Sequence, residues 1–277
     1  MEGTFLSYTT QEKNIINIIH NNDARSKKTT EILENKLKQK GYVISDVYDY
    51  NAILNICIGG DGAFLRAIHN YNFPYIPFIG VNTGHLGFFQ EILPDNLDHF
   101  VESFHQKKYM IEEIYLVEAL VCTRTSCMEL VGVNEIVIKG IESKVIHLNV
   151  SINDHYLERF SGDGLIVSSP IGSTAYNFSS GGSIVYPSLK ILQLTPLAPI
   201  NSKAYRSLTN SAIIPDSMTI KVNPEYRDEN SIIMVVDGNQ FKYDNIVEVT
   251  FKFSDMTLRK LTIDTQNFWS NVKDKFL

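Results

Sequence analysis

The stretch Ala52–Phe64 reads AILNICIGGDGAF, and it decides how the first part of the chain folds. Its apolar half, Ala52–Ile58, predicts a buried strand, and the residues after the glycines, Ala63–Asn70, predict a helix. Glycines between a strand and a helix let a ligand approach the backbone, because glycine has no Cβ. The free N–H groups at the start of such a helix favour anions. The stretch therefore predicts a phosphate-binding turn at the carboxyl end of a strand, where open α/β sheets bind ligands.

Strand and helix patterns alternate on both sides of this turn. Short apolar runs predict strands at Asn14–His20 and Ile76–Val81. Helical periodicity predicts helices at Lys27–Lys40, which Gly41 would end, and at Pro94–Tyr109. Strands that alternate with helices imply a parallel sheet with helical crossovers. We therefore expect an α/β domain with a parallel sheet in the N-terminal part of the chain.

The pattern changes near residue 112. Ile146–Asn153 and Ile246–Phe253 carry apolar residues at every second position, which is typical of half-buried strands. Asn153–Asp154 and Asp237–Gly238 lie between such runs and predict hairpin turns. Tyr186–Thr195 is the one segment of this part for which we expect a helix. The second domain is therefore expected to be β-rich.

The end of the chain predicts one more helix. Thr265–Phe276 is aromatic and amphipathic, and we expect it to pack back on the first domain. The expected organisation is an α/β domain at 1–112, a β-rich domain at 113–255 and a C-terminal segment at 256–277.

The composition is that of a globular protein with a sizeable core. Of the 277 residues, 44% are hydrophobic and 20% are charged, and the net charge is −6. This acidic balance argues against a general affinity for nucleic acid, which depends on clustered Lys and Arg. No segment reaches the apolar length that is needed to cross a bilayer, so we expect no membrane partner.

The cysteines and the N-terminus suggest where the protein resides. Cys57, Cys122 and Cys127 are scattered and complete no zinc-binding spacing. Cys122 and Cys127 are too far apart for a CxxC pair, so reduced thiols are expected. The N-terminal MEGTFLSYTTQEKN lacks the apolar core of a signal peptide. We therefore expect a soluble, cytoplasmic protein.

Asp61 is the unusual member of the glycine turn. A carboxylate beside phosphates is repelled unless it holds a magnesium ion or accepts a proton from an attacking hydroxyl. Kinase chemistry needs that hydroxyl to be placed in line with the phosphorus. The structural alternative is an aspartate that caps the helix after a tight turn.

Two other phosphate-binding loops do not fit. A P-loop requires a Gly-Lys dipeptide, which occurs nowhere in the chain. A dinucleotide fingerprint that starts at Gly60 would need a third glycine where Leu65 stands. A hydride-transferring Rossmann enzyme is therefore not expected.

A second group of candidate residues lies in the β-rich part. Gly162–Gly164 opens a predicted strand, and Pro170–Asn177 and Ser179–Gly182 then collect small residues, hydroxyls and the ring of Tyr176. Such groups can bind amides, sugars and a base, although Gly/Ser-rich loops are often only connections. Asn134–Glu135 is the third piece: an amide can pair with the edge of adenine, and a carboxylate can accept from ribose hydroxyls. By itself such a dipeptide is more often a solvated loop.

Taken in order, these segments resemble the NAD kinase family. The resemblance rests on IGGDGAF (Ile58–Phe64), GVNTGHLGF (Gly80–Phe88), Asn134–Glu135, SGDGLIVSSPIGSTAYNFSSGG (Ser161–Gly182) and the Asp237–Gly238 turn. It implies a kinase that transfers a phosphoryl group from ATP or another donor to the adenosine 2′-hydroxyl of NAD, giving NADP. It also implies Mg²⁺ or another divalent cation with the donor, and a homo-oligomer, either a tetramer or a dimer.

The resemblance also implies roles for individual residues. Asp61 would be the catalytic residue that orients or deprotonates the 2′-hydroxyl. The remaining residues would bind the substrates: the donor phosphates would face Gly59, Gly60 and Gly62, and NAD would contact Asn134, Glu135, Asp163, Thr174, Ala175, Tyr176, Ser179, Ala198 and Tyr205. The resemblance leaves open which residue of the chain contacts the metal.

Three departures from the family pattern accompany the match. Ala63 stands where a threonine is usual, Ser161 where many members carry arginine, and Ile171 where some relatives have a small or hydroxyl residue. Two other functions remain open from the residues: a lipid or sphingoid kinase that shares the GGDG loop, and a non-catalytic NAD-binding protein.

Overall fold

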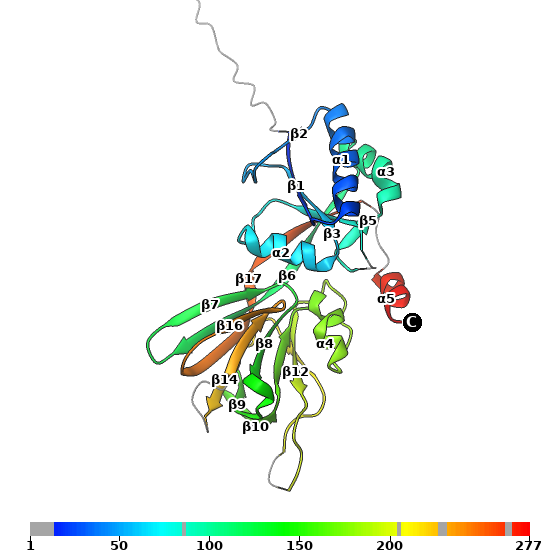
Figure 1. Cartoon of the computed structure of the whole chain (residues 1–277). Helices are drawn as coiled ribbons and strands as arrows, with labels where there is room; N and C mark the ends of the chain where they lie inside the picture. The colour runs from blue at the N-terminus through cyan, green and yellow to red at the C-terminus, as the bar shows by residue number, and fades with distance from the viewer. Residues whose placement is uncertain (1–13, 85–86, 204–205, 227–231, 264–267) are drawn as a thin grey trace, which may run out of the picture. The chain divides into compact units, whose positions relative to one another are not determined.

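The computed structural model describes residues 14–84, 87–203, 206–226, 232–263 and 268–277 (Figure 1). The chain forms two compact units. Unit 1 comprises residues 1–112 and 259–277, and unit 2 comprises residues 113–258. Within the described ranges, none of the helices is both long and apolar enough to cross a membrane.

Unit 1 is built on a parallel sheet. The order of its strands is β5-β4-β3-β1-β2, and all four pairings are parallel. These strands are β1 (Ile15–His20), β2 (Val43–Ile44), β3 (Leu54–Gly59), β4 (Phe78–Asn82) and β5 (Gln90–Ile92). The end of β17 (Ile246–Thr262) joins the sheet through Lys260, which pairs with Phe78 of β4. Every residue of β3 and β4 is buried, as expected for strands covered on both faces.

Unit 1 also contains helices. They are α1 (Ala24–Gln39), α2 (Asp61–Asn70), the 3-10 turn η1 (Pro94–Asn96), α3 (Leu97–His105) and the C-terminal α5 (Phe268–Phe276). Of these, α1 and α2 connect strands of the sheet. The side chain of Asp23 caps α1 by accepting the N–H of Ser26 at 2.9 Å, and Gly41 follows its end with φ +86°. Apolar residues of α1 and α3, among them Leu33, Leu37 and Phe100, share one core with the strands.

Unit 2 consists of two sheets. In the first, the strand order is β10-β9-β14-β17-β6-β7. Its remaining strands are β6 (Met110–Thr123), β7 (Cys127–Gly132), β9 (Ile146–Ile152), β10 (His155–Gly162) and β14 (Ile220–Glu225). The second sheet has the order β13-β12-β11-β8-β15-β16 and is antiparallel throughout. Its strands are β8 (Glu135–Gly140), β11 (Gly164–Ser168), β12 (Ile191–Leu197), β13 (Ala212–Pro215), β15 (Ile232–Val236) and β16 (Asn239–Lys242).

The two sheets of unit 2 enclose one apolar core. Leu148, Phe160 and Phe251 contribute from the first sheet, and Ile138 and Met234 contribute from the second. Successive side chains of a strand point to opposite faces, so the alternate residues of the second sheet turn away from this core. That second face carries the polar residues described below. The short helices η2 (Ile141–Ser143), η3 (Ile171–Thr174) and α4 (Tyr176–Ser179) complete the unit.

The fold class predicted from the sequence is confirmed: an α/β unit with a parallel sheet, a β-rich unit and a C-terminal helix. The expected hairpin turns also occur. Asn153–Asp154 joins β9 to β10, and Asp237–Gly238 joins β15 to β16. The expected C-terminal helix begins at Phe268 in the described part of the tail; residues 265–267 of that prediction lie outside the described residues.

The helix predicted at Tyr186–Thr195 is wrong. The first residues form a turn, in which the N–H of Leu189 donates to the carbonyl of Tyr186 at 3.1 Å, and β12 then begins at Ile191. Leu192 and Leu194 face the core, whereas the alternate residues face away from it. The residues from Ile191 onward alternate between the two faces of a strand. Pairing with β11 and β13 therefore outweighs the local helical pattern of this segment.

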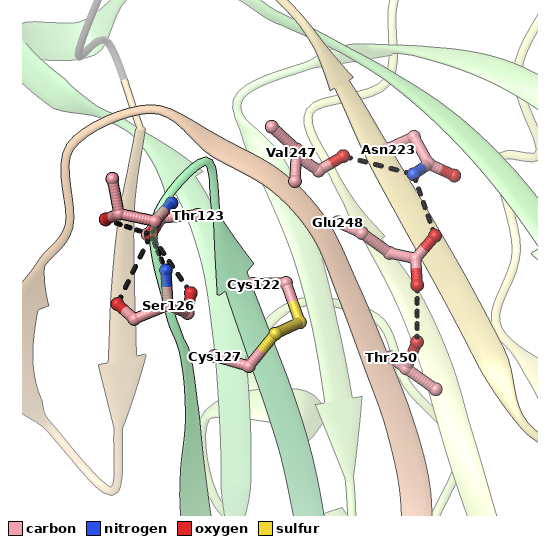
Figure 2. Close-up of a disulfide and its surroundings, with 9 residues drawn as sticks. Cys122, Thr123, Ser126, Cys127, Asn223, Val247, Glu248 and Thr250 are labelled. Carbon is pink, nitrogen blue, oxygen red and sulfur yellow. Dashed lines mark hydrogen bonds between the residues drawn. A yellow bond between two sulfur atoms is a disulfide. The ribbon is translucent and has the colours of Figure 1, made fainter.

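The prediction of reduced thiols is wrong for Cys122 and Cys127, which form a disulfide across the β6–β7 hairpin (Figure 2). The two residues are direct partners in the antiparallel register, with Cα atoms 4.0 Å apart. The four-residue connection is closed by the N–H of Thr123, which donates to the carbonyl of Ser126 at 2.8 Å. Hairpin pairing thus brings together two cysteines whose spacing fits no CxxC motif. Cys57 is a free, buried thiol.

Replacing Cys122 by serine should lower the free energy of unfolding by about 2 kcal/mol, because the short cross-linked loop no longer restricts the unfolded chain. Urea unfolding without reductant measures this difference. A thiol reductant should bring the wild-type protein down to the level of the variant. Equal stability of the two proteins without reductant would contradict the expectation.

Candidate active site

The glycine turn of unit 1 joins the buried strand β3 to α2. Gly60 is the N-cap residue of α2, and Asp61 is the first residue of the helix. The cap interpretation of Asp61 is therefore wrong, since the cap position belongs to a glycine without a side chain. A Cβ on Gly59 would lie 2.7 Å from the Cβ of Ala63, whereas a Cβ on Gly60 would meet nothing within 4 Å. Gly59 thus permits close packing of the turn, and Gly60 leaves its outer side open.

Backbone N–H groups hold the carboxylate of Asp61. Oδ2 accepts from the N–H of Phe88 at 3.0 Å, and Oδ1 accepts from the N–H of Phe89 at 3.1 Å. Gly87 is needed beside them, because a Cβ there would lie 2.1 Å from Oδ1. The Nζ atom of Lys275 lies 3.6 Å from Oδ2, and the side chain of Asp61 is 26% exposed. The carboxylate is therefore fixed in orientation and still accessible.

The next strand connection supports the turn. The N–H of Thr83 donates to the carbonyl of Gly59 at 3.1 Å, and the side-chain amide of Gln90 donates to the carbonyl of Gly60 at 2.9 Å. The side chain of Asn82 accepts the N–H of Gly84 at 2.9 Å. These bonds explain why the NTG and Gly87–Gln90 segments accompany GGDG in the chain.

Arg66 adds a positive charge beside the turn, and the sequence patterns did not single it out. Its guanidinium donates to Oδ1 of Asn21 at 2.9 Å, and its second terminal nitrogen would lie 3.4 Å from a Cβ on Gly62. Arg66 follows Gly62 by four residues, which places both on one face of α2. That spacing is the signal that could have identified it.

In unit 2, Asn134 directly precedes strand β8 and Glu135 is its first residue; both are buried, with 8% and 6% of their surface exposed. Oδ1 of Asn134 and Oε2 of Glu135 are both buried without a hydrogen-bond partner. An acceptor without a partner is costly, so two neighbouring ones mark a site that a donor ligand would satisfy. The solvated-loop alternative for this dipeptide is wrong.

Asp237 sets the backbone of that dipeptide, a role that the sequence analysis missed. Its carboxylate accepts the N–H groups of Val133 and Asn134, both at 2.7 Å, and that of Glu135 at 3.2 Å. Its own N–H donates to the carbonyl of Glu135 at 3.2 Å. The sequence identified Asp237 only as a turn residue, and the partners lie about a hundred positions earlier in the chain. No local pattern could therefore have revealed the role.

Glu135 is in an unusual electrostatic environment. Burial, followed by the negative charge of Asp237, raises its pKa to about 8, against the opposing effect of the N–H of Tyr176, which donates to the carboxylate. A carboxyl group that is protonated near neutral pH in the free protein can exchange its proton for donors on a ligand.

The segment Pro170–Asn177 packs directly on the Asn134–Glu135 backbone. A Cβ on Gly172 would lie 1.9 Å from the carbonyl oxygen of Asn134, and the N–H of Ser169 donates to that carbonyl at 2.9 Å. Asn177 is buried, where its side chain donates to Gln193 at 3.1 Å and accepts from Thr195 at 2.6 Å. The structure therefore brings together the predicted residues Asn134, Glu135, Thr174, Ala175 and Tyr176.

A cavity of about 520 Å³ lies at the other end of β8. Three predicted residues line it, Asp163, Tyr176 and Ala198, and three cations line it with them, Lys139, Lys144 and Lys242. Lys139 and Lys242 both pair with Ile233 in the sheet register, so the two lysines lie on one face. The sequence analysis did not single out these lysines.

The remaining candidates have varied surroundings. Ser179 is exposed on α4 and is not among the residues that line the cavity. Ser161 is fully buried, with its hydroxyl 2.8 Å from Nδ1 of His147, so this position offers no group to a ligand. Tyr205 lies outside the described residues.

Comparisons with known proteins agree across almost the whole chain. The family model of the ATP-NAD kinase N-terminal domain matches residues 6–109, and that of the ATP-NAD kinase C-terminal domain matches residues 133–258. The NAD kinase of Finegoldia magna is 48% identical over 95% of this chain and 98% of its own length. The NAD kinase of Staphylococcus aureus is 31% identical over 82% of this chain and 85% of its own.

Two solved structures share the fold. Yeast NADH kinase in complex with NADH superposes with a TM-score of 0.83 at 16% identity, covering 96% of this chain and 88% of the other. An NAD kinase from Archaeoglobus fulgidus in complex with ATP superposes with a TM-score of 0.73 at 22% identity, covering 94% of this chain and 98% of the other.

The raised pKa of Glu135 predicts a pH-dependent stability. Between the ordinary value of 4.5 and about 8, the folded protein keeps a proton that the unfolded chain releases, so stability falls as the pH rises through this window. Glu135→Gln removes this proton exchange. The variant should match the wild type near pH 5 and exceed its unfolding free energy near pH 8, by up to about 4 kcal/mol.

Denaturant unfolding at several pH values measures this difference. A difference between variant and wild type that stays constant over the window would show that Glu135 titrates normally.

Proposed function

The chain belongs to the NAD kinase family, and on this basis we propose that Asp61 is the residue that prepares the adenosine 2′-hydroxyl of NAD for phosphoryl transfer. The reaction is the ATP-dependent phosphorylation of NAD to NADP, the activity of the relatives that match nearly the whole chain. The hydroxyl oxygen forms a bond to the γ-phosphorus, the bond from that phosphorus to the bridging oxygen of ADP breaks, and the hydroxyl loses its proton.

The observation that supports this role most is the fixed carboxylate of Asp61. Each of its oxygens accepts one backbone N–H, from Phe88 and from Phe89, and a carboxylate oxygen can accept a second hydrogen bond. A substrate hydroxyl that donates to such a pre-oriented oxygen is aligned without further rearrangement, which lowers the entropic part of the barrier. The same oxygen can accept the proton as the bond to phosphorus forms.

The start of α2 is suited to the phosphates of the donor. Gly60 leaves the outer side of the turn open, and the first N–H groups of the helix, together with its dipole, favour negative charge. Arg66 supplies a full positive charge at the same turn. Gly59, Gly60 and Gly62 thus serve the donor through their backbone.

Asn134 and Glu135 are suited to the adenosine half of NAD. The free acceptor Oδ1 of Asn134 can take a hydrogen bond from the exocyclic amine of adenine, and Oε2 of Glu135 can take one from a ribose hydroxyl. Thr174 and Ala175 lie in the segment that packs on this dipeptide. The two orphaned oxygens make this assignment specific, since both would gain partners on binding.

The cavity lined by Asp163, Tyr176 and Ala198 is suited to the rest of the dinucleotide. Asp163 is exposed there and can accept from the second ribose, while Tyr176 presents a ring. Lys139 and Lys242 supply positive charge for the pyrophosphate. Many family members carry an arginine where this chain has Ser161, which is buried and uncharged. The two lysines would supply the positive charge that such an arginine provides.

A metal ion, an oligomeric state and a cellular location complete the proposed function. A divalent cation such as Mg²⁺ would enter with the phosphates of ATP and neutralise their charge, since the described residues contain no cluster of three or more His, Cys, Asp or Glu that could hold a metal. The protein would act as a homo-oligomer, a tetramer or a dimer. A cytoplasmic location stays a prediction.

The two alternative functions are not favoured. A lipid or sphingoid kinase would need an apolar cleft, whereas the residues around Asn134 and the cavity of unit 2 are polar and charged. A non-catalytic NAD-binding protein would not need the fixed and accessible carboxylate of Asp61.

Purified protein incubated with NAD, ATP and Mg²⁺ should form NADP, which an NADP-specific dehydrogenase detects. Asp61→Asn keeps the size of the side chain but removes the proton acceptor, so kcat should fall about 10²- to 10⁴-fold while NAD binding by calorimetry is retained. Absence of NADP with the wild type, or undiminished turnover in the variant, would defeat the proposal.

Gly87→Ala tests whether the orientation of Asp61 matters. The new methyl group would lie 2.1 Å from Oδ1, so the carboxylate must move, and kcat should fall at least about tenfold. The double variant with Asp61→Asn should be no slower than Asp61→Asn alone, because both changes act through one carboxylate. Losses that multiply in the double variant would show that Gly87 acts by another route.

A further inference from the structure

The C-terminal helix places a cation at the carboxylate of Asp61. Nζ of Lys275 lies 3.6 Å from Oδ2 of Asp61 and 4.6 Å from the centre of the Phe88 ring. The side chain of Lys275 is 30% exposed, so its ammonium group is partly shielded and still open to a ligand. No sequence motif points to Lys275, which lies near the C-terminus and far from Asp61 in the sequence.

Packing against Phe88 holds this helix in place. The rings of Phe268 and Phe276 lie 6.1 Å and 5.9 Å from the ring of Phe88, and Val272 is buried at 7% exposure. Residues spaced by four share one face of a helix, so Phe268, Val272 and Phe276 form its apolar face. Lys275 follows Val272 by three residues and lies at the border of that face. Phe88 therefore contacts the helix with its ring and Asp61 with its N–H.

Phosphoryl transfer needs positive charge near the transferred group. Negative charge spreads over the phosphoryl oxygens in the transition state, and a positioned cation stabilises it more than the ground state. The chain has no Gly-Lys dipeptide and hence no lysine of the P-loop type. In the described parts of unit 1, Lys275 is the cation that forms an ion pair with Asp61.

We infer that Lys275 is a catalytic residue of the phosphoryl transfer, delivered to the active centre by the C-terminal helix. In the free protein its ammonium group pairs with Asp61. With both substrates bound, it contacts an oxygen of the transferred phosphoryl group and keeps its own proton. The proton of the 2′-hydroxyl goes to Asp61, the oxygen–phosphorus bond forms, and ADP leaves.

This inference rests on the proposed role of Asp61 and adds to it. A lysine within 4 Å of a carboxylate that must accept a proton then has a reason: Lys275 pairs with Asp61 in the free protein and with the donor phosphates when the substrates are bound. The competing explanation is that Lys275 only anchors the helix through its contact with Phe88 and Asp61.

Three variants of the full-length protein separate these explanations. Lys275→Gln removes the charge, Lys275→Arg keeps it, and Lys273→Gln removes an exposed charge from the same helix as a matched control. The measurements are kcat, the KM values for NAD and for ATP, and the melting temperature.

If Lys275 is catalytic, Lys275→Gln lowers kcat at least about tenfold and raises KM for ATP, with KM for NAD within about twofold. Lys275→Arg then recovers most of the lost rate, and Lys273→Gln behaves as the wild type. Activity of Lys275→Gln within about twofold of the wild type would overturn the inference. So would equal losses in the Gln and Arg variants together with a lower melting temperature, because they indicate an anchor.

These outcomes differ from a failure of the proposed function. If Asp61→Asn is inactive and Lys275→Gln is normal, the role of Lys275 is wrong and that of Asp61 stands. If the wild-type protein makes no NADP, the proposed function itself is wrong.

Discussion

The carboxylate of Asp61 is held by the N–H groups of Phe88 and Phe89, and the function proposed for unit 1 depends on this interaction. A carboxylate at the start of a helix could point in several directions, and these two donors select one. The selection requires Gly87, because any side chain there would occupy the space of the carboxylate. It also requires the Gln90 side chain, which ties the loop back to the carbonyl of Gly60. The glycine turn is thus one half of a site whose other half follows the next strand.

The same device recurs in unit 2. The carboxylate of Asp237 accepts three successive N–H groups, from Val133 to Glu135, and so fixes the backbone of the candidate NAD-binding dipeptide. Fixing that backbone leaves Oδ1 of Asn134 and Oε2 of Glu135 buried without partners. Such orphaned acceptors cost stability in the free protein, and a donor ligand relieves the cost when it binds. The negative charge of Asp237 also helps to raise the pKa of Glu135. Asp237 therefore influences both the backbone geometry of the dipeptide and the protonation of Glu135.

Much of the fold could be predicted, because it follows from local patterns. Patterns among neighbouring residues predict the strand at Leu54–Gly59, the helix after it and the hairpin turn at Asp237–Gly238. The strand β12 could not be predicted in this way, since its local sequence also suits a helix and its pairing with β11 and β13 decides the outcome. The prediction of reduced thiols at Cys122 and Cys127 failed for the same reason. Their disulfide depends on the register of the hairpin, which the cysteine spacing does not reveal.

By itself the sequence determined the two-part fold class, the glycine turn with Asp61, and the resemblance that names the reaction. Periodicity and turn preferences involve only residues that are close together in the chain, so the sequence alone is enough to predict the elements that depend on them. Tertiary structure alone decided that Phe88 and Phe89 hold Asp61, that Asp237 sets the Asn134–Glu135 backbone, and that Lys275 reaches Asp61. These partners are far apart in the chain, and only the register of the strands and the packing of the last helix bring their polar groups within hydrogen-bond or ion-pair distance.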